Sequence, residues 1–466
     1  MLKSLKLHGI GPAKKGLSAS FGERLNVLTG DNGLGKSFLL DISFWALTGQ
    51  WPGNRVAIPE RDAPGGSPTI TYQIVGKGEH PGPKTAKYSF QTQSWARPKG
   101  PPTTPALVIY ATVDGGFAVW DPARNYWRRT GSEVSEEPEH PRAYQFTPGS
   151  LADGLREDGR VSCKGLIDDW VNWYYQRTSS SLSSSSGSSD SWGSSSSSGM
   201  GDYPMTLAET ESSSSSEPGA LPFSAFGLLE DVIAQLSHPQ EPISPAAPAR
   251  VFVNDTREYP VLQLPYGKVA YPHWPAGMKR VIGLAYLLVW SWHEHVQAAE
   301  LRHEEPTDRI ILLVDEIESH LHPKWQRTIV PALLKVTERL RAQLQVQVEM
   351  ATHSPLILAS LEPHFDTARD RLFWFDLQSG VVHFKEFPWA IQGDVVGWLT
   401  SDIFGLEQAR SQEAEQAIEA AEAFRRGETT ALPDGLRTEE QIDAALRKYL
   451  AGMDPFWPRW SLEVKT

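Results

Sequence analysis

A glycine-rich run near the start of the chain has the residue types and spacing of a phosphate-binding loop. The run matches the pattern G-x-x-x-x-G-K-[ST] in full. Its residues are Gly30, Asp31, Asn32, Gly33, Leu34, Gly35, Lys36 and Ser37. Glycines let successive backbone N–H groups point at phosphate oxygens. Lys36 would reach the β and γ phosphates of ATP, and the Ser37 hydroxyl would ligate Mg²⁺. An apolar strand before the run and a helix after it disfavour the alternative, a chance glycine-rich turn.

Two acidic residues follow a second apolar strand, far along the chain. The strand spans 310–314 and ends at Asp315 and Glu316. A buried parallel strand delivers the residues at its C-terminal end to the crevice where ligands bind. Asp315 would orient Mg²⁺ through its water shell, and Glu316 would polarise a water for in-line attack on the γ-phosphate. An acidic pair is common at a strand end, but beside a phosphate loop it predicts ATP hydrolysis.

A histidine follows the next expected strand, at 346–350. His353 at such a strand end could hydrogen-bond the γ-phosphate and report its loss. The alternative is a capping turn before a helix that begins near Pro355. A metal site that adds His320 and His322 is a further alternative, although an i, i+2 pair shares one face only in an extended chain.

Strands and helices alternate around these residues, which predicts an α/β fold with a sheet flanked by helices. We expect strands at 2–7, 17–21, 25–28, 69–75, 106–110 and 117–120, with a hairpin around 114–116. Helices are expected at 37–47, 277–292 and 323–344, and 150–177 should be helical. Further strands are expected at 250–253, 261–264, 372–377 and 381–387, before two helices at 412–426 and 438–450.

Composition shifts divide the chain into four expected segments. The segment 178–216 is dominated by serine and should be disordered, because it cannot bury enough apolar area to offset its ordering entropy. The expected segments are an N-terminal ATPase lobe at 1–125, a helical insert at 126–249, a C-terminal ATPase lobe at 250–390 and a helical tail at 391–466.

Net charge, cysteine content and the length of apolar runs indicate which partners and which cellular compartment to expect. A net charge of -12 argues against a protein that coats nucleic acid nonspecifically. The single cysteine, Cys163, cannot form an intrachain disulfide and fits a reducing, cytoplasmic compartment. The sequence shows neither a signal peptide nor eighteen consecutive apolar residues, so no membrane partner is expected.

The motifs together resemble those of ABC/SMC-type P-loop ATPases. The phosphate loop corresponds to Walker A, the strand with Asp315-Glu316 to Walker B, and His353 to the switch histidine. The runs at 315–323 and 351–355 are similar to the D-E-x-E-x-H-L-H-P and T-H-S-P runs of prokaryotic SMC-like ATPases. Those include the overcoming-lysogenisation-defect ATPases and the ATPase subunits of paired phage-defence systems. The D-E-P-T-S-A-L-D run of transporter domains is absent.

The resemblance also implies a signature motif that contacts the γ-phosphate on a second subunit. The best match is the run 274–280, where Gly277, Lys279 and Arg280 could face an anion. Pro275 and Met278 depart from the S-x-G-[EQ] pattern, which puts efficient hydrolysis across subunits in doubt. For the family's glutamine loop, the candidate is Gln145.

Three functions are compatible with these features. The first is an ATPase that forms at least a dimer around ATP and controls a separately encoded effector, such as a nuclease, in bacterial phage defence. The second is a DNA-repair or chromosome-maintenance ATPase that binds DNA directly. The third is an ATP-gated scaffold with slow turnover. The aromatic run at 454–460 should either pack back on the ATPase core or serve as a docking peptide.

Overall fold

The apolar runs that precede the candidate site residues become neighbouring strands of one eight-stranded sheet in the computed structural model. The strand order is β18-β17-β3-β16-β15-β7-β8-β9. The five central strands are parallel, and β18, β8 and β9 extend the edges antiparallel. The bounds are β3 Leu25–Gly30, β7 Leu107–Ala111, β8 Phe117–Trp120, β9 Tyr144–Phe146, β15 Arg309–Asp315, β16 Gln345–Ala351, β17 Arg371–Gln378 and β18 Val381–Phe387. The expected hairpin around 114–116 joins β7 to β8.

The structure describes most of the chain and divides it into two units. The described residues are 1–12, 16–53, 55–59, 67–76, 82–96, 106–125, 142–157, 159–185, 224–340, 344–429 and 432–462. The first unit is Met1–Trp389 and the second is Ala390–Thr466. None of the helices described within these ranges is long and apolar enough to cross a membrane. The expected boundaries at 125 and 249 within the first unit stay predictions.

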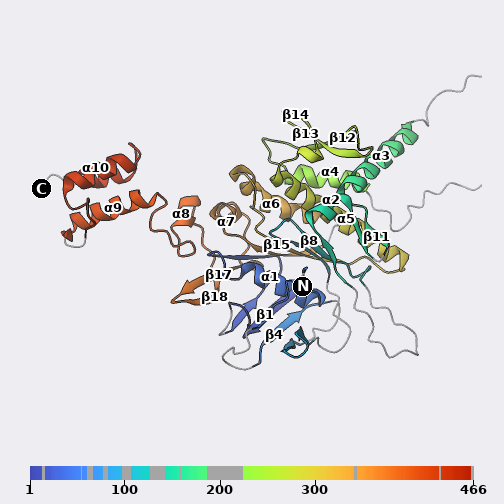
Figure 1. Ribbon diagram of the computed structural model, residues 1–466, viewed down its shortest axis with the longest axis horizontal. Coiled ribbons are helices and arrows are strands. Elements are labelled where there is room, and N and C mark those ends of the chain that lie inside the picture. The colour runs from blue at the N-terminus through green and yellow to red at the C-terminus, as the bar shows by residue number, and fades with distance from the viewer. Residues whose placement is uncertain are drawn as a thin grey trace, which may run out of the picture. The chain divides into compact units, whose positions relative to one another are not determined.

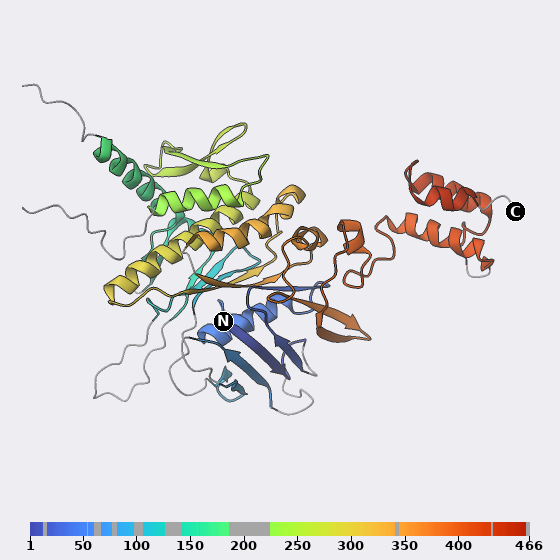
Figure 2. The same ribbon diagram turned by 180° about the vertical axis from the view of Figure 1, so that it is seen from behind.

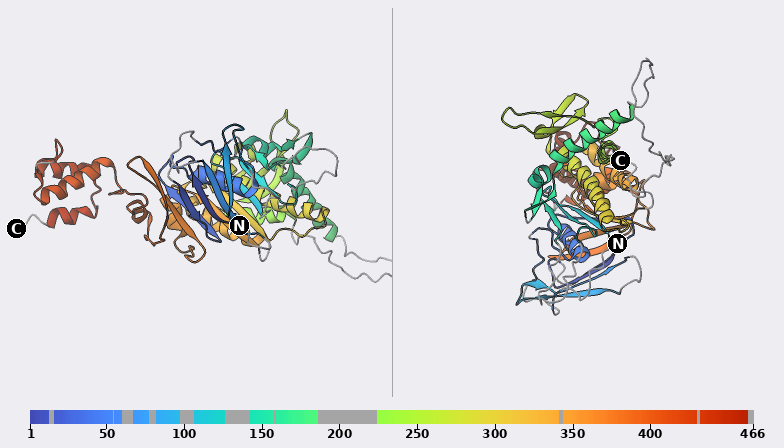
Figure 3. Two further views of the ribbon diagram at one scale, coloured as in Figure 1. Left: turned by 90° about the horizontal axis from the view of Figure 1, so that it is seen from below. Right: turned by 90° about the vertical axis from the view of Figure 1, so that its right-hand side faces the viewer.

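A second, antiparallel sheet and the helix after the phosphate loop cover one face of the central sheet. The helix, α1, spans Lys36–Thr48, and the second sheet has the order β2-β1-β4-β5-β6. Its strands are β1 Leu2–His8, β2 Leu17–Ser20, β4 Thr69–Ile74, β5 Lys84–Ser89 and β6 Ser94–Trp95. Apolar residues of both sheets and of α1 share one core, so α1 is held between the two sheets (Figure 1; Figure 3, right).

Helices cover the other face of the central sheet, as Figure 2 shows from behind. They are α4 Ala225–Leu236, α5 Ala276–Leu301, α6 Pro323–Leu340 and α7 Pro355–Leu361. The helix α4 contacts both α5 and α6. Most of α5 is buried, and β15 is buried from Ile310 to Asp315. The result is the mixed sheet flanked by helices that the sequence predicts, with the P-loop at the end of β3.

The region in and just after the expected helical insert, 126–249, differs from the prediction. Among the described residues of 148–185, the helices are α2 Pro148–Asp153 and α3 Leu166–Ser185. A two-stranded ribbon, β10 Leu155–Glu157 with β11 Arg160–Cys163, separates them. The helix α3 includes the first eight residues of the expected disordered segment 178–216, and the rest of that segment lies outside the described residues. The strand expected at 250–253 is wrong, because β12 ends at Arg250. The ranges here are β12 Ser244–Arg250, β13 Glu258–Leu264, β14 Gly267–Ala270 and η1 Tyr271–His273.

The second unit is a small helical structure with its own core. Its helices are α8 Val395–Leu399, α9 Gln412–Arg425, α10 Glu439–Tyr449 and α11 Phe456–Leu462. The aromatic run belongs to this core, because Phe456 and Trp460 are buried with apolar residues of α9 and α10. The Arg425 guanidinium lies 4.5 Å from the centre of the Trp460 ring and donates to the Trp460 carbonyl at 2.8 Å. The aromatic run therefore packs on helices of the second unit.

A buried carboxylate beneath α1 is expected to make the stability of the first unit depend on pH. Glu349 of β16 is fully buried, and neither carboxylate oxygen has a hydrogen-bond partner within the described residues. Burial raises the pKa of Glu349 to about 7, although the nearby Ser43 hydroxyl opposes the rise. The unfolded chain therefore loses this proton near pH 4.5, before the folded chain does. Folding stability should fall as pH rises from about 4.5 to about 7 and then level off.

Replacing Glu349 with glutamine should remove this fall in stability. In the wild type, the free energy of unfolding should fall by about 3 kcal/mol as pH rises, which is the energetic equivalent of the pKa shift of Glu349. Melting temperatures measured from pH 5 to pH 8 would check this prediction. The melting temperature of E349Q should gain several degrees on that of the wild type across this range. A constant difference between the two proteins would contradict the prediction.

Candidate active site

Three glycines shape the loop between β3 and α1, and each has a left-handed backbone. The φ angles of Gly30, Gly33 and Gly35 are 127°, 77° and 105°. A Cβ atom on Gly30 would lie 2.0 Å from the carbonyl oxygen of Phe375 in β17, and one on Gly35 would lie 2.4 Å from the Pro12 ring. A Cβ on Gly33 would meet nothing within 4 Å, so only its φ angle favours glycine there. This is the local geometry that a phosphate-binding loop requires.

Lys36 begins α1 and turns its ammonium group back over the loop. Its Nζ donates to the carbonyl oxygens of Gly30 and Asp31, both at 2.8 Å. Burial lowers the pKa of Lys36, while the negative charges of Glu316 and Asp315 oppose the shift. The lysine and the two carboxylates are therefore close in space, although nearly three hundred residues separate them in the sequence. An ammonium group has three N–H donors, so the third can serve a phosphate.

Asp315 and Ser37 have the chemistry of a Mg²⁺ site. Asp315 ends β15 and is fully buried, and neither of its carboxylate oxygens has a hydrogen-bond partner within the described residues. Burial raises the pKa of Asp315, and the neighbouring Ser37 hydroxyl opposes the rise. A buried carboxylate without partners is costly unless a cation compensates its charge. The residues present therefore fit the hard, oxygen-liganded Mg²⁺ ion that the sequence predicts.

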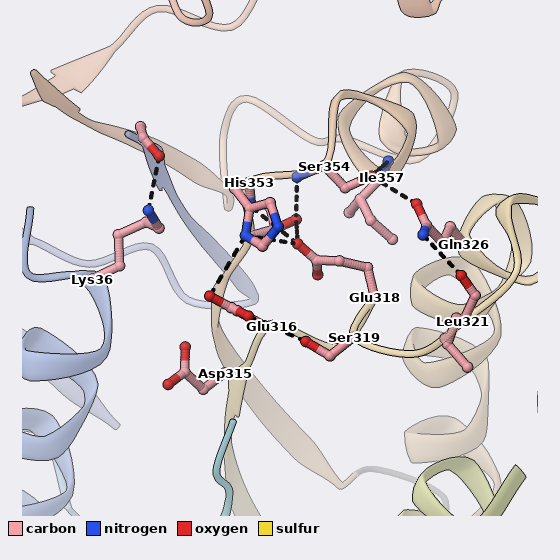
Figure 4. A network of polar contacts seen from close by, with 12 residues as sticks. Lys36, Asp315, Glu316, Glu318, Ser319, Leu321, Gln326, His353, Ser354 and Ile357 are labelled. Carbon is pink, nitrogen blue, oxygen red and sulfur yellow. Dashed lines mark hydrogen bonds and ion pairs between the residues drawn. The ribbon is translucent and has the colours of Figure 1, made fainter. Parts of the chain in front are cut away.

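Glu316 leaves the strand in a conformation that directs its side chain into the site. Its φ angle is 47°, which is unusual for a residue with a side chain and costs backbone energy. The Glu316 N–H donates to the Ala351 carbonyl at 3.0 Å, and the Ser319 hydroxyl donates to Oε2 at 3.1 Å. The other carboxylate oxygen, Oε1, lies 3.5 Å from Nδ1 of His353 (Figure 4).

His353, the expected switch histidine, follows β16 and is partly exposed, with 43% of its side chain accessible. The capping alternative is also present in the structure. Ser354 is the N-cap of α7, and its hydroxyl accepts from the Ile357 N–H at 3.3 Å. Both roles are compatible, because the cap involves Ser354 while the imidazole of His353 faces Glu316.

The start of α5 lies directly behind the turn 316–322 between β15 and α6 of the same chain, called the Walker B turn below. A Cβ on Gly277 would lie 2.5 Å from the His320 carbonyl oxygen, so the glycine allows α5 to approach this turn closely. The Arg280 guanidinium donates to the carbonyls of Asp315 at 2.6 Å, Glu316 at 3.0 Å and Val113 at 2.8 Å. Lys279 lies 5.2 Å from the Tyr271 ring centre. Contact of these residues with the phosphate of another subunit stays a prediction.

The structure does not bring two other candidates into the site. Gln145 lies on β9, where its Oε1 accepts from the Gly53 N–H at 3.0 Å. His320 and His322 line an apolar cavity of about 150 Å³ between α5 and α6. Among the described residues, the one group of three with ligand atoms close enough for a metal is Glu407, Glu415 and Glu419 of the second unit. The metal site at His320, His322 and His353 is therefore not formed.

Sequence reasoning missed Glu318 and a charged cluster behind the P-loop helix. Tyr110 donates to Asp41 of α1 at 2.9 Å, and burial raises the pKa of Asp41 to about 6. The Arg55 guanidinium lies 3.9 Å from Asp41 and is close enough to Asp315 to lower the pKa of that carboxyl. Arg55 follows α1 in a stretch rich in proline and glycine, where no motif marks it. Glu318 lies inside the run 315–323, and the sequence pattern indicates no role for it.

The fold and the site have the features of a P-loop nucleotide-binding head and are similar to those of ABC/SMC-type ATPases. These features are the loop after β3, the acidic pair that ends β15 and the histidine that follows β16. Residues 266–359, which include the last two of these features, match the family model described as "AAA domain, putative AbiEii toxin, Type IV TA system".

Two curated proteins are similar to part of this chain. The "Retron Ec83 probable ATPase" of Escherichia coli is 31% identical over 98 residues, which are 21% of this chain and 15% of that protein. The "Retron Vc95 probable ATPase" of Vibrio cholerae serotype O1 biovar El Tor is 45% identical over 51 residues, 11% of this chain and 9% of that protein. The chain therefore matches only a small part of the length of these relatives. The SMC head domain from Thermotoga maritima is 14% identical, with 83% of this chain and 99% of that chain covered and a TM-score of 0.37.

Proposed function

We propose that this protein binds ATP with Mg²⁺, hydrolyses it, and uses ATP-driven dimerisation to control a separately encoded effector in bacterial phage defence. The observation that carries the proposal is the convergence of Lys36, Asp315 and Glu316 at one place. Bound Mg²⁺ would neutralise phosphate charge there. Lys36 would hold the phosphates, Asp315 and Ser37 would hold the ion, and Glu316 would orient the attacking water.

The exposure of the catalytic end supports dimerisation. The side chains of Glu316 and His353 are 25% and 43% exposed, so one subunit alone leaves them open to water. Phosphoryl transfer benefits from a closed site in which charge interactions are stronger. A second subunit placed over this end would close the site.

The effector and the role in phage defence are supported by the motifs and by two similar proteins. The sequence motifs resemble those of ATPase subunits from paired phage-defence systems, and two similar proteins are each named as a retron "probable ATPase". Fold alone does not decide the function. A stable complex between this chain and the product of an adjacent gene would support this part of the proposal.

The start of α5 favours a second candidate, a scaffold that binds ATP and turns it over slowly. Pro275 caps α5 without any side-chain hydrogen bond, and the Arg280 guanidinium donates to carbonyls of its own chain. This end of α5 therefore offers few groups to the phosphate of another subunit. A turnover rate that Glu316→Gln does not change would favour the scaffold.

The dependence of ATPase rate on protein concentration tests the dimer. If two subunits complete each site, the rate should rise more steeply than linearly with concentration until the dimer saturates. The specific activity should then become constant. A specific activity that is constant over a hundredfold range, together with a single-subunit mass in ATP and Mg²⁺, would exclude a composite site. The measurement uses the full chain at fixed, saturating ATP.

A further inference from the structure

Glu318 lies beside the candidate catalytic residues and contacts the turn 352–354 between β16 and α7, called the switch turn below. It comes two residues after Glu316, and only 4% of its side chain is exposed. Its Oε1 accepts from the Thr352 hydroxyl at 2.7 Å and from the His353 backbone N–H at 3.0 Å. One buried oxygen therefore fixes the backbone at the position that carries the switch histidine.

The imidazole of His353 lies between two carboxylates (Figure 4). Its Nδ1 lies 3.5 Å from Oε1 of Glu316 and 3.7 Å from Oε1 of Glu318. Ionised carboxylates can only accept hydrogen bonds, so this arrangement favours a proton on Nδ1. The other ring nitrogen, Nε2, is then the one that can meet a phosphate.

The second oxygen of Glu318 argues against a purely structural role. Oε2 is buried and has no hydrogen-bond partner within the described residues. A buried carboxylate with an unpaired oxygen costs folding free energy, so a residue chosen for stability alone would not be placed there. The fold should tolerate the loss of this charge.

We propose that Glu318 is a positioning residue that fixes His353 for the terminal phosphate of ATP. It holds the His353 backbone through Oε1 and, together with Glu316, orients the imidazole ring. This inference rests on the proposed ATPase function. The contacts of Glu318 couple the Walker B turn to the switch turn. Loss of the phosphate contact at His353 would therefore also displace Glu316.

A second bridge keeps the switch turn folded when Glu318 is changed. The Ser354 hydroxyl donates to Oε1 of Gln326 in α6 at 2.9 Å, and Nε2 of Gln326 donates to the Leu321 carbonyl at 3.0 Å. These contacts do not involve Glu318. Its replacement should therefore misplace His353 without unfolding the segment.

Steady-state kinetics of the full chain test the proposal. We expect Glu318→Ala to lower kcat about 100-fold, the size of effect that misplacement by about 1 Å can produce, with KM for ATP within about threefold. Glu318→Gln keeps an oxygen that can accept both hydrogen bonds, so it should retain kcat within about tenfold. Glu349→Gln removes an equally buried carboxylate that does not touch the switch turn and should leave kcat unchanged. A kcat for E318A within twofold of wild type would overturn the proposal.

A double-mutant cycle separates positioning from general damage. If Glu318 acts through His353, the E318A/H353A double variant should have the kcat of H353A alone within about threefold. A further 100-fold loss in the double variant would show that Glu318 acts independently of His353 and would overturn the proposal. Melting temperatures of all variants accompany the cycle.

Hydrogen exchange decides the inference even if the chain does not hydrolyse ATP. Equal rates for wild type and E316Q would sink the proposed ATPase function but leave the contact at His353 to be tested. We expect the His353 amide to exchange at least about tenfold faster in E318A than in wild type. In the control variant E349Q, the His353 amide should exchange at the wild-type rate. Equal exchange in E318A and wild type would overturn the positioning role.

Discussion

Replacing Glu316 with glutamine should lower kcat for ATP hydrolysis by about a thousandfold and leave ATP affinity within about threefold. The glutamine side chain has the same shape, so the Ser319 hydroxyl can still donate to its oxygen, as it does to Oε2 of Glu316 at 3.1 Å. The amide cannot accept the proton of an attacking water, and a positioned base typically contributes 10² to 10⁴ in rate. Binding should persist because Lys36, Ser37 and Asp315 are unchanged.

Two measurements on the same protein check the effect of Glu316→Gln. Phosphate release at saturating ATP gives kcat, and calorimetry with a non-hydrolysable ATP analogue and Mg²⁺ gives affinity. Glu386→Gln is a matched control, because Glu386 is an exposed carboxylate on β18 that pairs with Arg371 at 3.2 Å. The control should behave as wild type. An E316Q protein that turns over at the wild-type rate would remove Glu316 from the chemistry.

The parts of the site that could be predicted from the sequence are those in which a short pattern determines the geometry. The loop 30–37 contains its own glycines and lysine, and the strand 310–314 places Asp315 by simple continuation. The alternation of strands and helices then predicts a sheet that aligns these segments. The parallel pairing of β3 with β16 and of β16 with β15 does so in the structure.

Glu318 could not be predicted because its role depends on contacts between distant segments. Its partners, Thr352 and His353, come 34 and 35 residues later in the chain. The sequence also cannot show that the side chain is buried, since Glu318 stands only two residues after Glu316 in a short acidic stretch. The same limit hid the packing role of Gly277, which the sequence marks only as a possible anion contact and which allows a close approach to the His320 carbonyl.

The errors in the middle region have local causes. The apolar spacing of 150–177 is compatible with one helical region, but Gly154 and Gly165 both have positive φ angles. A Cβ on Gly165 would lie 2.3 Å from the Gly154 nitrogen, so the two glycines allow the ends of the β10–β11 ribbon to meet. The strand β12 was missed because Pro245 and Pro248 are unusual in a strand. Among the described strands it pairs with β13 alone and lies at the edge of its sheet, where proline is tolerated.

Replacing Lys36 with alanine should weaken the binding of ATP by about 100-fold. Lys36 supplies a positive charge within reach of Asp315 and Glu316, and the carbonyls of Gly30 and Asp31 fix its ammonium group. A hydrogen bond between charged groups contributes about 1.5–3 kcal/mol, which corresponds to roughly 10- to 150-fold in affinity. Without the lysine, the two carboxylates would also repel the triphosphate.

Calorimetry with a non-hydrolysable ATP analogue and Mg²⁺ measures this loss directly. Lys268→Ala is the matched control, because Lys268 is an exposed lysine on β14, away from the P-loop. The control should bind the analogue as the wild type does, and both variants should keep the wild-type melting temperature without nucleotide within a few degrees. Added analogue should raise the melting temperature of wild type and K268A but hardly that of K36A, because stabilisation by a ligand follows its affinity. Equal affinity in K36A and wild type would mean that the phosphates do not bind at this loop. The roles proposed for Asp315, Glu316 and His353 would then be wrong as well, because each depends on a phosphate bound there.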